Sequence, residues 1–166
     1  MPSLRALAAT AALLLCGGCS MAEEPAAPPV APSPAHCAET SATPTTDRPP
    51  ALASTTSAWF GQGDLWVGLP DYPPTAQGDA LVLRFPVVTL ARGEPTSTRG
   101  APVVTAARVD MAGEAPGQIG AFSRAYGTDE LSFWPASVAF PDPGCWAVTG
   151  LLGSASLRFT VAVVQP

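Results

Sequence analysis

The chain ends in a strict alternation of apolar and other side chains. Alternate positions from Leu157 to Val163 are apolar, and Arg158 and Thr160 lie between them. A period of two over this length is typical of a β-strand with one face in a core, because successive side chains of a strand point to opposite faces. The segment therefore predicts a strand whose apolar face must be covered by other strands.

Short apolar runs bounded by Gly, Pro or Asp turn residues precede this strand. They cover residues 65–69, 80–85, 103–109, 131–140 and 146–150. Leu151 to Ser154 predicts a hairpin connection into the final strand. Pro135 lies within the fourth run, and it favours a sheet edge or a bulge there because proline has no N–H to donate to a neighbouring strand.

No stretch after Ser57 has a sustained helical period, and the apolar runs recur at a spacing of about ten residues. Only 13% of the chain is charged and 47% is apolar, so this part is expected to fold. We therefore expect one all-β domain over residues 58–166. An immunoglobulin-like sandwich is the favoured architecture, and a small β-barrel is the alternative.

The N-terminus has the architecture of a signal peptide. Arg5 provides a basic start, an apolar run begins at Ala6, and Gly17 and Gly18 close it. A membrane-spanning helix needs about twenty apolar residues, so this run is too short to span a bilayer. Residues 1–18 therefore predict a segment that directs export and is then removed.

The sequence LLLCGGCS, which holds Cys16 and Cys19, leaves two processing fates open. The two glycines before Cys19 resemble the lipobox of bacterial lipoproteins, in which a small residue precedes a cysteine that receives a diacylglyceryl group. Cys16 departs from that pattern, which prefers leucine at its position. Acyl chains at Cys19 would anchor the protein to the outer side of the cell membrane or to an outer membrane, at about 0.8 kcal/mol per buried CH₂. In the other fate, ordinary signal peptidase cleaves after Ala22 and releases a chain that begins at Glu23.

Residues 19–57 are rich in Pro, Ala, Ser and Thr and show no apolar periodicity. Chains of this composition form extended tethers of about 3.1 Å per residue where they adopt a polyproline conformation. We expect a disordered tether between the anchor at Cys19 and the folded domain that begins at residue 58.

Cysteine counting supports export. Both processing fates remove or use Cys16 and Cys19 and leave the even pair Cys37 and Cys145. A disulfide between these two would close a loop of roughly a hundred residues, and the chain-entropy model assigns such a loop up to about 4.7 kcal/mol of stability. The rival interpretation, a CxxC redox motif at residues 16–19, is disfavoured because Cys16 lies in the removed segment.

Residues 140–164, FPDPGCWAVTGLLGSASLRFTVAVV, resemble the C-terminal signature of a family of uncharacterised bacterial lipoproteins and secreted proteins. The shared pattern is Phe-Pro, Gly-Cys-Trp, Val-Thr-Gly and Ser-Leu-x-Phe. GDLWVGLP, residues 63–70, is similar to the family's Leu-Trp strand, and Cys37 falls where its N-terminal cysteine is expected. The chain departs from the family's tryptophan-rich segment after Pro86. The resemblance implies an immunoglobulin-like fold, an envelope location and pairing of Cys37 with Cys145, and it supplies no activity.

The sequence offers little for catalysis, metals, cofactors or nucleic acids. The only histidine is His36, so the domain lacks the usual general base, and no Gly-x-Ser-x-Gly motif occurs. Zinc needs three or four ligands that the mature chain does not gather. The net charge is -5 and the eight arginines are scattered singly, whereas nucleic-acid binding needs clustered cations. We therefore expect no catalytic residues, no metal, no cofactor and no nucleic-acid partner.

Carboxylates leave one enzymatic alternative open. Asp129 and Glu130 are adjacent, and Glu94, Asp110 and Glu114 lie near expected loops. A pair of these acids a few ångströms apart would suit a hydrolase that acts on cell-wall material.

Aromatic residues indicate a binding surface more strongly. Adjacent aromatic pairs occur at Trp59 with Phe60 and at Phe133 with Trp134, and neighbouring strand residues point to opposite faces. One residue of each pair must then face solvent, a second sheet or a bulge. Tyr72 lies among the prolines of PDYPP, residues 70–74, where a core cannot easily claim it. The candidate surface consists of Trp59, Phe60, Tyr72, Tyr126 and Trp134.

The sequence thus predicts a non-enzymatic, lipid-anchored protein of the cell envelope. Its partners would be the membrane, through the anchor at Cys19, and an envelope protein or a glycan. The alternatives are a secreted carboxylate-based hydrolase and a purely accessory subunit, which would present an apolar patch without a pocket.

Overall fold

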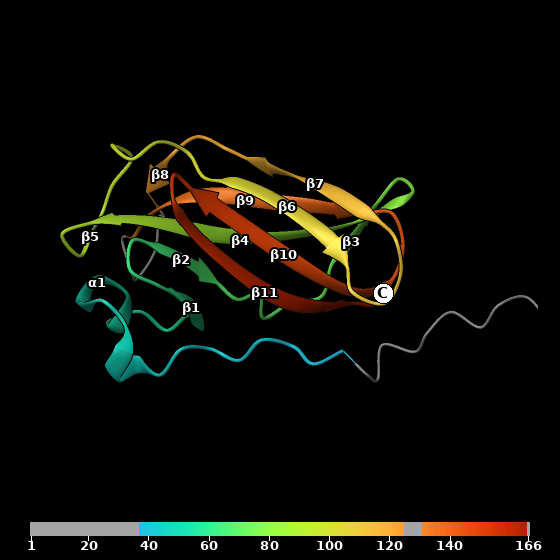
Figure 1. The fold of residues 1–166 in the computed structure, drawn as a ribbon, viewed down its shortest axis with the longest axis horizontal. Helices are drawn as coiled ribbons and strands as arrows, with labels where there is room; N and C mark the ends of the chain where they lie inside the picture. The colour runs from blue at the N-terminus through green and yellow to red at the C-terminus, as the bar shows by residue number, and fades with distance from the viewer. Residues whose placement is uncertain (1–36, 125–130, 166) are drawn as a thin grey trace, which may run out of the picture. The chain divides into compact units, whose positions relative to one another are not determined.

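The computed structural model describes residues 37–124 and 131–165, and almost all of its regular structure is β-strand. This confirms the all-β fold class (Figure 1). Two short helical turns, η2 (Thr45–Asp47) and α1 (Pro50–Ala53), precede the strands. In the described ranges no helix is long and apolar enough to cross a membrane. The strands are β1 (Trp59–Gln62), β2 (Leu65–Gly68), β3 (Thr75–Gln77), β4 (Ala80–Ala91), β5 (Glu94–Pro95), β6 (Val103–Arg108), β7 (Glu114–Ile119), β8 (Ser123–Arg124), β9 (Ser132–Phe140), β10 (Gly144–Leu152) and β11 (Ala155–Val163).

The strands follow the order β1-β2-β4-β9-β7-β6-β10-β11, and every pairing is antiparallel. The first half of β7 pairs with β6 and its second half pairs with β9, so one strand belongs to both layers. The first layer then holds β2, β4, β9 and the end of β7, which corresponds to the A-B-E-D order of an immunoglobulin sheet, while β6, β10 and β11 correspond to C-F-G. Because β11 also contacts β1 and β2, the sandwich is nearly closed like a barrel.

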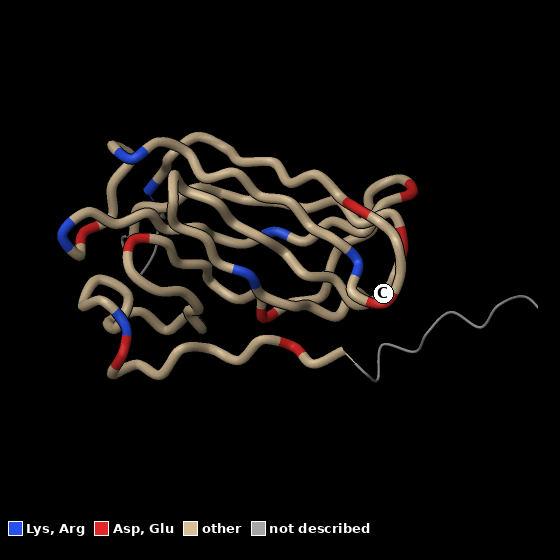
Figure 2. The backbone as a smooth tube through the Cα atoms, in the orientation of Figure 1, with Lys and Arg blue, Asp and Glu red and all other residues tan. Residues whose placement is uncertain are grey.

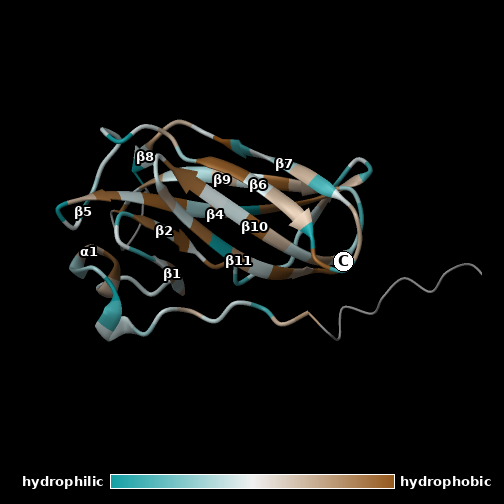
Figure 3. Cartoon of the chain, in the orientation of Figure 1, coloured by the Kyte–Doolittle hydropathy of each residue, from teal (hydrophilic) through white to brown (hydrophobic). Residues whose placement is uncertain are grey.

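The main core lies between the two layers. Alternate residues of β4 and β9, such as Leu83, Phe85 and Val138, face alternate residues of β10 and β11, such as Val148 and Phe159. The rings of Phe85 and Phe159 meet edge to face with their centroids 5.4 Å apart, which joins the layers directly. Figure 3 shows the resulting alternation of hydrophobic and hydrophilic bands along the strands.

A second, smaller core lies on the other face of the first layer. It consists of Leu52, Trp59, Trp66, Val88, Leu90 and Leu131. Leu52, from α1, is fully buried in it. The prediction that residues 19–57 form a disordered tether is therefore wrong for residues 37–57, which pack onto the domain because Leu52 covers apolar side chains that β1, β2 and β4 leave outside the sandwich.

Residues 37–43, which we call the N-terminal strap, run from one end of the strand order to the other. At β11, the Thr40 N–H donates to the Thr160 carbonyl at 3.1 Å and the Thr160 N–H donates back to Thr40 Oγ1 at 2.8 Å. At β1, the Thr43 N–H donates to the Trp59 carbonyl at 2.8 Å. The strap thus pairs with both edge strands and covers backbone groups that they would otherwise expose.

The disulfide between Cys37 and Cys145 fixes the start of the strap, with 5.3 Å between the two Cα atoms. Cys145 lies on β10, so the bond reaches across β11 to the strand beside it. The pairing predicted from the cysteine count and from the family resemblance is present in the structure.

Pro135 does not lie on an edge strand, because β9 pairs with β4 on one side and with β7 and β8 on the other. Its register partner across β4 is another proline, Pro86. Pro135 falls between the residues of β9 that pair with β8 and those that pair with β7, and its carbonyl accepts the Gly120 N–H at 2.7 Å. The strand tolerates proline there because its neighbour changes at that point. Of the two expectations for Pro135, the sheet edge is wrong, whereas the pairing is irregular as in a bulge, with three residues (120–122) facing two (134–135).

Candidate binding groove

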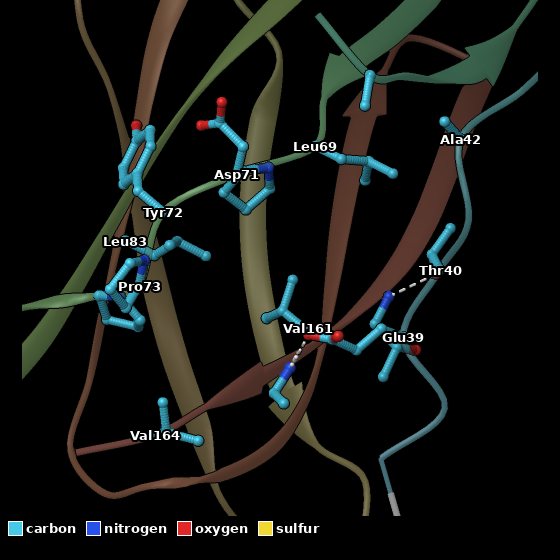
Figure 4. A pocket seen from close by; sticks show the side chains of 15 residues that line it. Glu39, Thr40, Ala42, Leu69, Asp71, Tyr72, Pro73, Leu83, Val161 and Val164 are labelled. Carbon is cyan, nitrogen blue, oxygen red and sulfur yellow. Dashed lines mark hydrogen bonds between the residues drawn. The ribbon is translucent and has the colours of Figure 1, made fainter. Parts of the chain in front are cut away.

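A groove of about 460 Å³ opens between the N-terminal strap, β11 and the loop that precedes β3. Figure 4 shows its walls: Glu39, Thr40 and Ala42 on the strap side, and Leu69, Asp71, Tyr72 and Pro73 on the loop side. Val161 and Val164, at the end of the chain, lie between the two walls. Because strap residues form one wall, the groove depends on the same contacts that hold the strap in place.

Tyr72 is the most exposed aromatic side chain of the groove, with 49% of its surface accessible. Its hydroxyl donates to the Arg84 carbonyl at 2.5 Å, which ties the ring to β4. Partial burial raises the pKa of the Tyr72 phenol, the charge of Asp71 raises it further, and the charge of Arg84 lowers it in part. Tyr72 therefore stays neutral and presents an apolar ring face at physiological pH.

Tyr72 also lines a second hollow of about 300 Å³. Its lining is mainly rings and apolar chains, from Trp59, Phe85, Pro86, Leu131, Phe133 and Pro135, and Arg84 provides its only charge among the described lining residues. Because the Tyr72 ring takes part in the lining of both depressions, the two belong to one surface. We call this surface the Tyr72 groove.

The polar groups of the Tyr72 groove suit binding better than acid–base chemistry. Glu39 Oε1 accepts the Ala162 N–H at 3.1 Å, so this carboxylate already holds the strap on β11. Asp71 is the second carboxylate of the lining. Within residues 37–124 and 131–165, no three His, Cys, Asp or Glu side chains gather as a metal site requires.

The structure buries two of the predicted surface aromatics. Trp59 is 1% exposed in the second core, where its Nε1 donates to Thr55 Oγ1 at 2.6 Å. Trp134 is 9% exposed in the main core, where its Nε1 donates to the buried Thr89 hydroxyl at 3.0 Å. The prediction that both lie on a free surface is wrong, because the first layer carries a core on each of its faces.

The other predicted residues have different outcomes. Phe60 is half-buried against the main core, and Tyr72 is exposed in the groove as expected. Tyr126 and the anchor Cys19 lie outside the described residues, as do Asp129 and Glu130. Among the predicted surface aromatics that the structure describes, Tyr72 is the one with a well-exposed ring in the groove.

Among the acids considered for a hydrolase, Asp110 has a definite structural partner. Its carboxylate accepts a hydrogen bond from Arg108 Nε at 2.9 Å, and this bond holds the pKa of Asp110 below its ordinary value. Arg108 also lies over the Trp146 ring at 5.7 Å from its centroid. Asp110 is thus a charge partner of a cation held on the core, which leaves it a poor proton donor.

Sequence reasoning missed the strap residues of the groove. Glu39, Thr40 and Ala42 lie in a Pro/Ala/Ser/Thr-rich segment, and only the nearby Cys37 indicated that the segment meets the domain. The prolines around Tyr72, in PDYPP, carried a better signal, because prolines on both sides restrict the backbone and present the ring outward.

Comparison with protein-family models, with curated proteins and with solved structures finds no match to this chain.

Proposed function

We propose that this chain is an exported, lipid-anchored, non-catalytic protein of the cell envelope, and that the Tyr72 groove binds its extracytoplasmic partner. The observation that carries the proposal is the exposed Tyr72 ring that lines two depressions, with prolines and aliphatic chains around it. Aromatic rings held in place at low entropy cost are characteristic of recognition surfaces. An envelope protein is favoured over a glycan, because the hollow beside Phe133 offers few polar groups for sugar hydroxyls.

The strap supports the proposed location. The disulfide at Cys37 fixes the chain at the point where the proline-rich spacer, residues 22–36, ends. A disulfide of this kind is typical of proteins outside the cytoplasm. In the proposal, Cys19 carries the lipid and the spacer presents the domain to partners at the membrane surface.

Site-specific photocrosslinking in the intact cell envelope tests the groove. A photoreactive amino acid replaces Asp71, on the groove wall, and in a control it replaces Arg92, which is exposed in the turn between β4 and β5. We expect a discrete crosslinked adduct from position 71 and none from position 92. The additional substitution Tyr72→Ala should abolish the adduct. Equal yields from both positions, or an adduct that persists without Tyr72, would contradict the proposal.

A further inference from the structure

The outer face of the second layer, on the side away from the main core, is built from side chains in regular rows. Leu151 on β10 is the register partner of Val103 on β6. One row further along lie Arg158, Thr149, Thr105 and Pro116, on β11, β10, β6 and β7 in that order. Ala107 and Glu114 belong to the next row. We call this surface the β10–β6 face.

Two large apolar side chains lie side by side at one end of this face. Val103 is 59% exposed and Leu151 is 43% exposed. Single exposed apolar residues are common, but cross-strand partners on adjacent strands form a continuous apolar spot. Between the margins the face holds Thr149, Thr105, Ala147 and Ala107, which leave its centre low enough for a second sheet to approach. At the end of the face opposite Leu151 lies Cys145 with its disulfide to Cys37.

The charges of the β10–β6 face lie at its two margins and are opposite in sign. Arg158 is exposed on β11, at one margin, and Glu114 is exposed on β7, at the other. Neither forms an ion pair with another residue of the described ranges. Figure 2 shows that most other charges of the domain lie in loops at the ends of the layers.

Glu114 also borders a hollow of about 300 Å³ on the same face, lined by Thr105, Ala107, Pro116 and Thr149. The face therefore carries a long cationic side chain at one margin and a depression with a carboxylate at the other. These two features are complementary to each other, and they are too far apart, on opposite sides of β10 and β6, to meet within one chain.

We propose that a second copy of this chain docks on the β10–β6 face and forms a symmetric dimer. A two-fold axis parallel to the strands, between β10 and β6, places β10 of each copy over β6 of the other and β11 over β7. Leu151 of each copy then meets Val103 of the other. Arg158 of each copy then lies over Pro116 of the other copy. Its side chain extends into that copy's hollow and pairs with Glu114 there, which lies about one row beyond Pro116.

The geometry favours a second copy over an unrelated partner. A two-fold interface requires that each feature finds its complement on the same surface, and the apolar pair and the charge pair both meet this condition about one axis. Sheets that pack face to face in this manner lie about 10 Å apart, which suits small central residues such as Thr149 and Thr105. The Tyr72 groove is lined by other residues, so the dimer and the proposed function can be tested independently.

Charge exchange between the two margins tests the dimer. The full mature chain is purified in detergent, and its mass is measured by light scattering and by sedimentation over a range of concentrations. We expect the wild type to dimerise, Arg158→Glu and Glu114→Arg each to raise the dissociation constant at least about tenfold, and the double exchange R158E/E114R to restore it. The matched control, Arg92→Glu in the β4–β5 turn, should leave the dimer unchanged.

Thermal unfolding of each variant shows that it is folded, which is expected because both substituted side chains are exposed. A wild-type monomer throughout the concentration range would overturn the proposal. Single exchanges without effect, or a double exchange that fails to restore association, would overturn it as well.

Discussion

Gly117 lies against Val104 so closely that a Cβ built on the glycine would be 2.5 Å from the Val104 carbonyl oxygen and 2.7 Å from the Val104 Cβ. This contact occurs where β7 leaves β6 and joins β9, because Pro116 pairs with Thr105 and Gly117 already pairs with Val138. Only a residue without a side chain lets the strand pass this close to the neighbouring backbone. The continuity of the two layers depends on this position.

The substitution Gly117→Ala should therefore lower the free energy of unfolding by about 1–3 kcal/mol, because the added methyl group must displace backbone atoms in a packed core. Chemical denaturation measures the change. Gly120→Ala is the matched control at the end of the same segment, where the nearest atoms to a built Cβ are 3.5 Å away. We expect the control to change stability by less than about 0.5 kcal/mol. Equal effects of the two substitutions would contradict the account of the corner.

Leu52→Ala should lower the free energy of unfolding by about 2–5 kcal/mol, the usual cost of a cavity at a buried leucine. The reason is its complete burial in the second core. Denaturant titration measures this variant and the control Val109→Ala, which truncates a side chain that is 54% exposed. The comparison separates the loss of buried contacts from the general effect of a smaller apolar side chain. If residues 37–57 were a free tether, the two variants would be equally stable.

Removal of the disulfide by Cys37→Ala with Cys145→Ala should lower the free energy of unfolding by up to about 4.7 kcal/mol, the chain-entropy value for a loop of about a hundred residues. The structural separation of the two cysteines is 108 residues. Unfolding is measured with and without a reductant, which should destabilise the wild type and leave the double variant unchanged. A wild type that is indifferent to reduction would show that the strap is held by its hydrogen bonds alone.

The phenol of Tyr72 should titrate above its ordinary pKa of 10.0, first because burial disfavours the phenolate and second because Asp71 repels it. The folded state then keeps a proton that the unfolded chain loses near pH 10, so this contribution to stability is complete below about pH 10 and is lost as the pH rises through the folded-state pKa. The Tyr126→Phe variant leaves Tyr72 as the only tyrosine, and the absorbance of its phenolate measures the titration.

Asp71→Asn in the same background should bring the pKa of Tyr72 closer to 10.0, because it removes the repulsion and leaves the burial. Arg92→Gln, which removes a charge in the β4–β5 turn, is the control. A Tyr72 phenol that ionises at or below pH 10 would contradict the described environment of the groove.

The sequence indicated the strands whose apolar residues alternate cleanly, and both ends of β10 and of β11 lie within two residues of their expected bounds. β7 was missed because Pro116 and Gly117 interrupt its apolar alternation. These two residues lie where β7 stops pairing with β6 and starts pairing with β9. Such a strand has no periodic signal, since it belongs to one sheet for half of its length and to the other for the rest.

The candidate site was only partly predictable. Strand alternation leaves one residue of each aromatic pair for solvent, a second sheet or a bulge, and it does not reveal a second core. Trp59 belongs to that core and Phe133 packs against it, and Leu52, from the chain before residue 58, completes it. Tyr72 was found because the prolines around it give a local signal. The strap wall of the groove depends on long-range hydrogen bonds that backbone N–H groups of β11 donate to the side chains of Glu39 and Thr40, which no local pattern encodes.

Intact mass spectrometry of the protein from its own membranes, with and without reduction, tests the central claim of an anchored, strap-closed domain most directly. We predict a chain that begins at Cys19, is heavier by a diacylglyceryl group and gains the mass of two hydrogens when the Cys37–Cys145 bond is reduced. A lipid-free chain that begins at Glu23 would contradict the anchor, and a mass unchanged by reduction would contradict the disulfide.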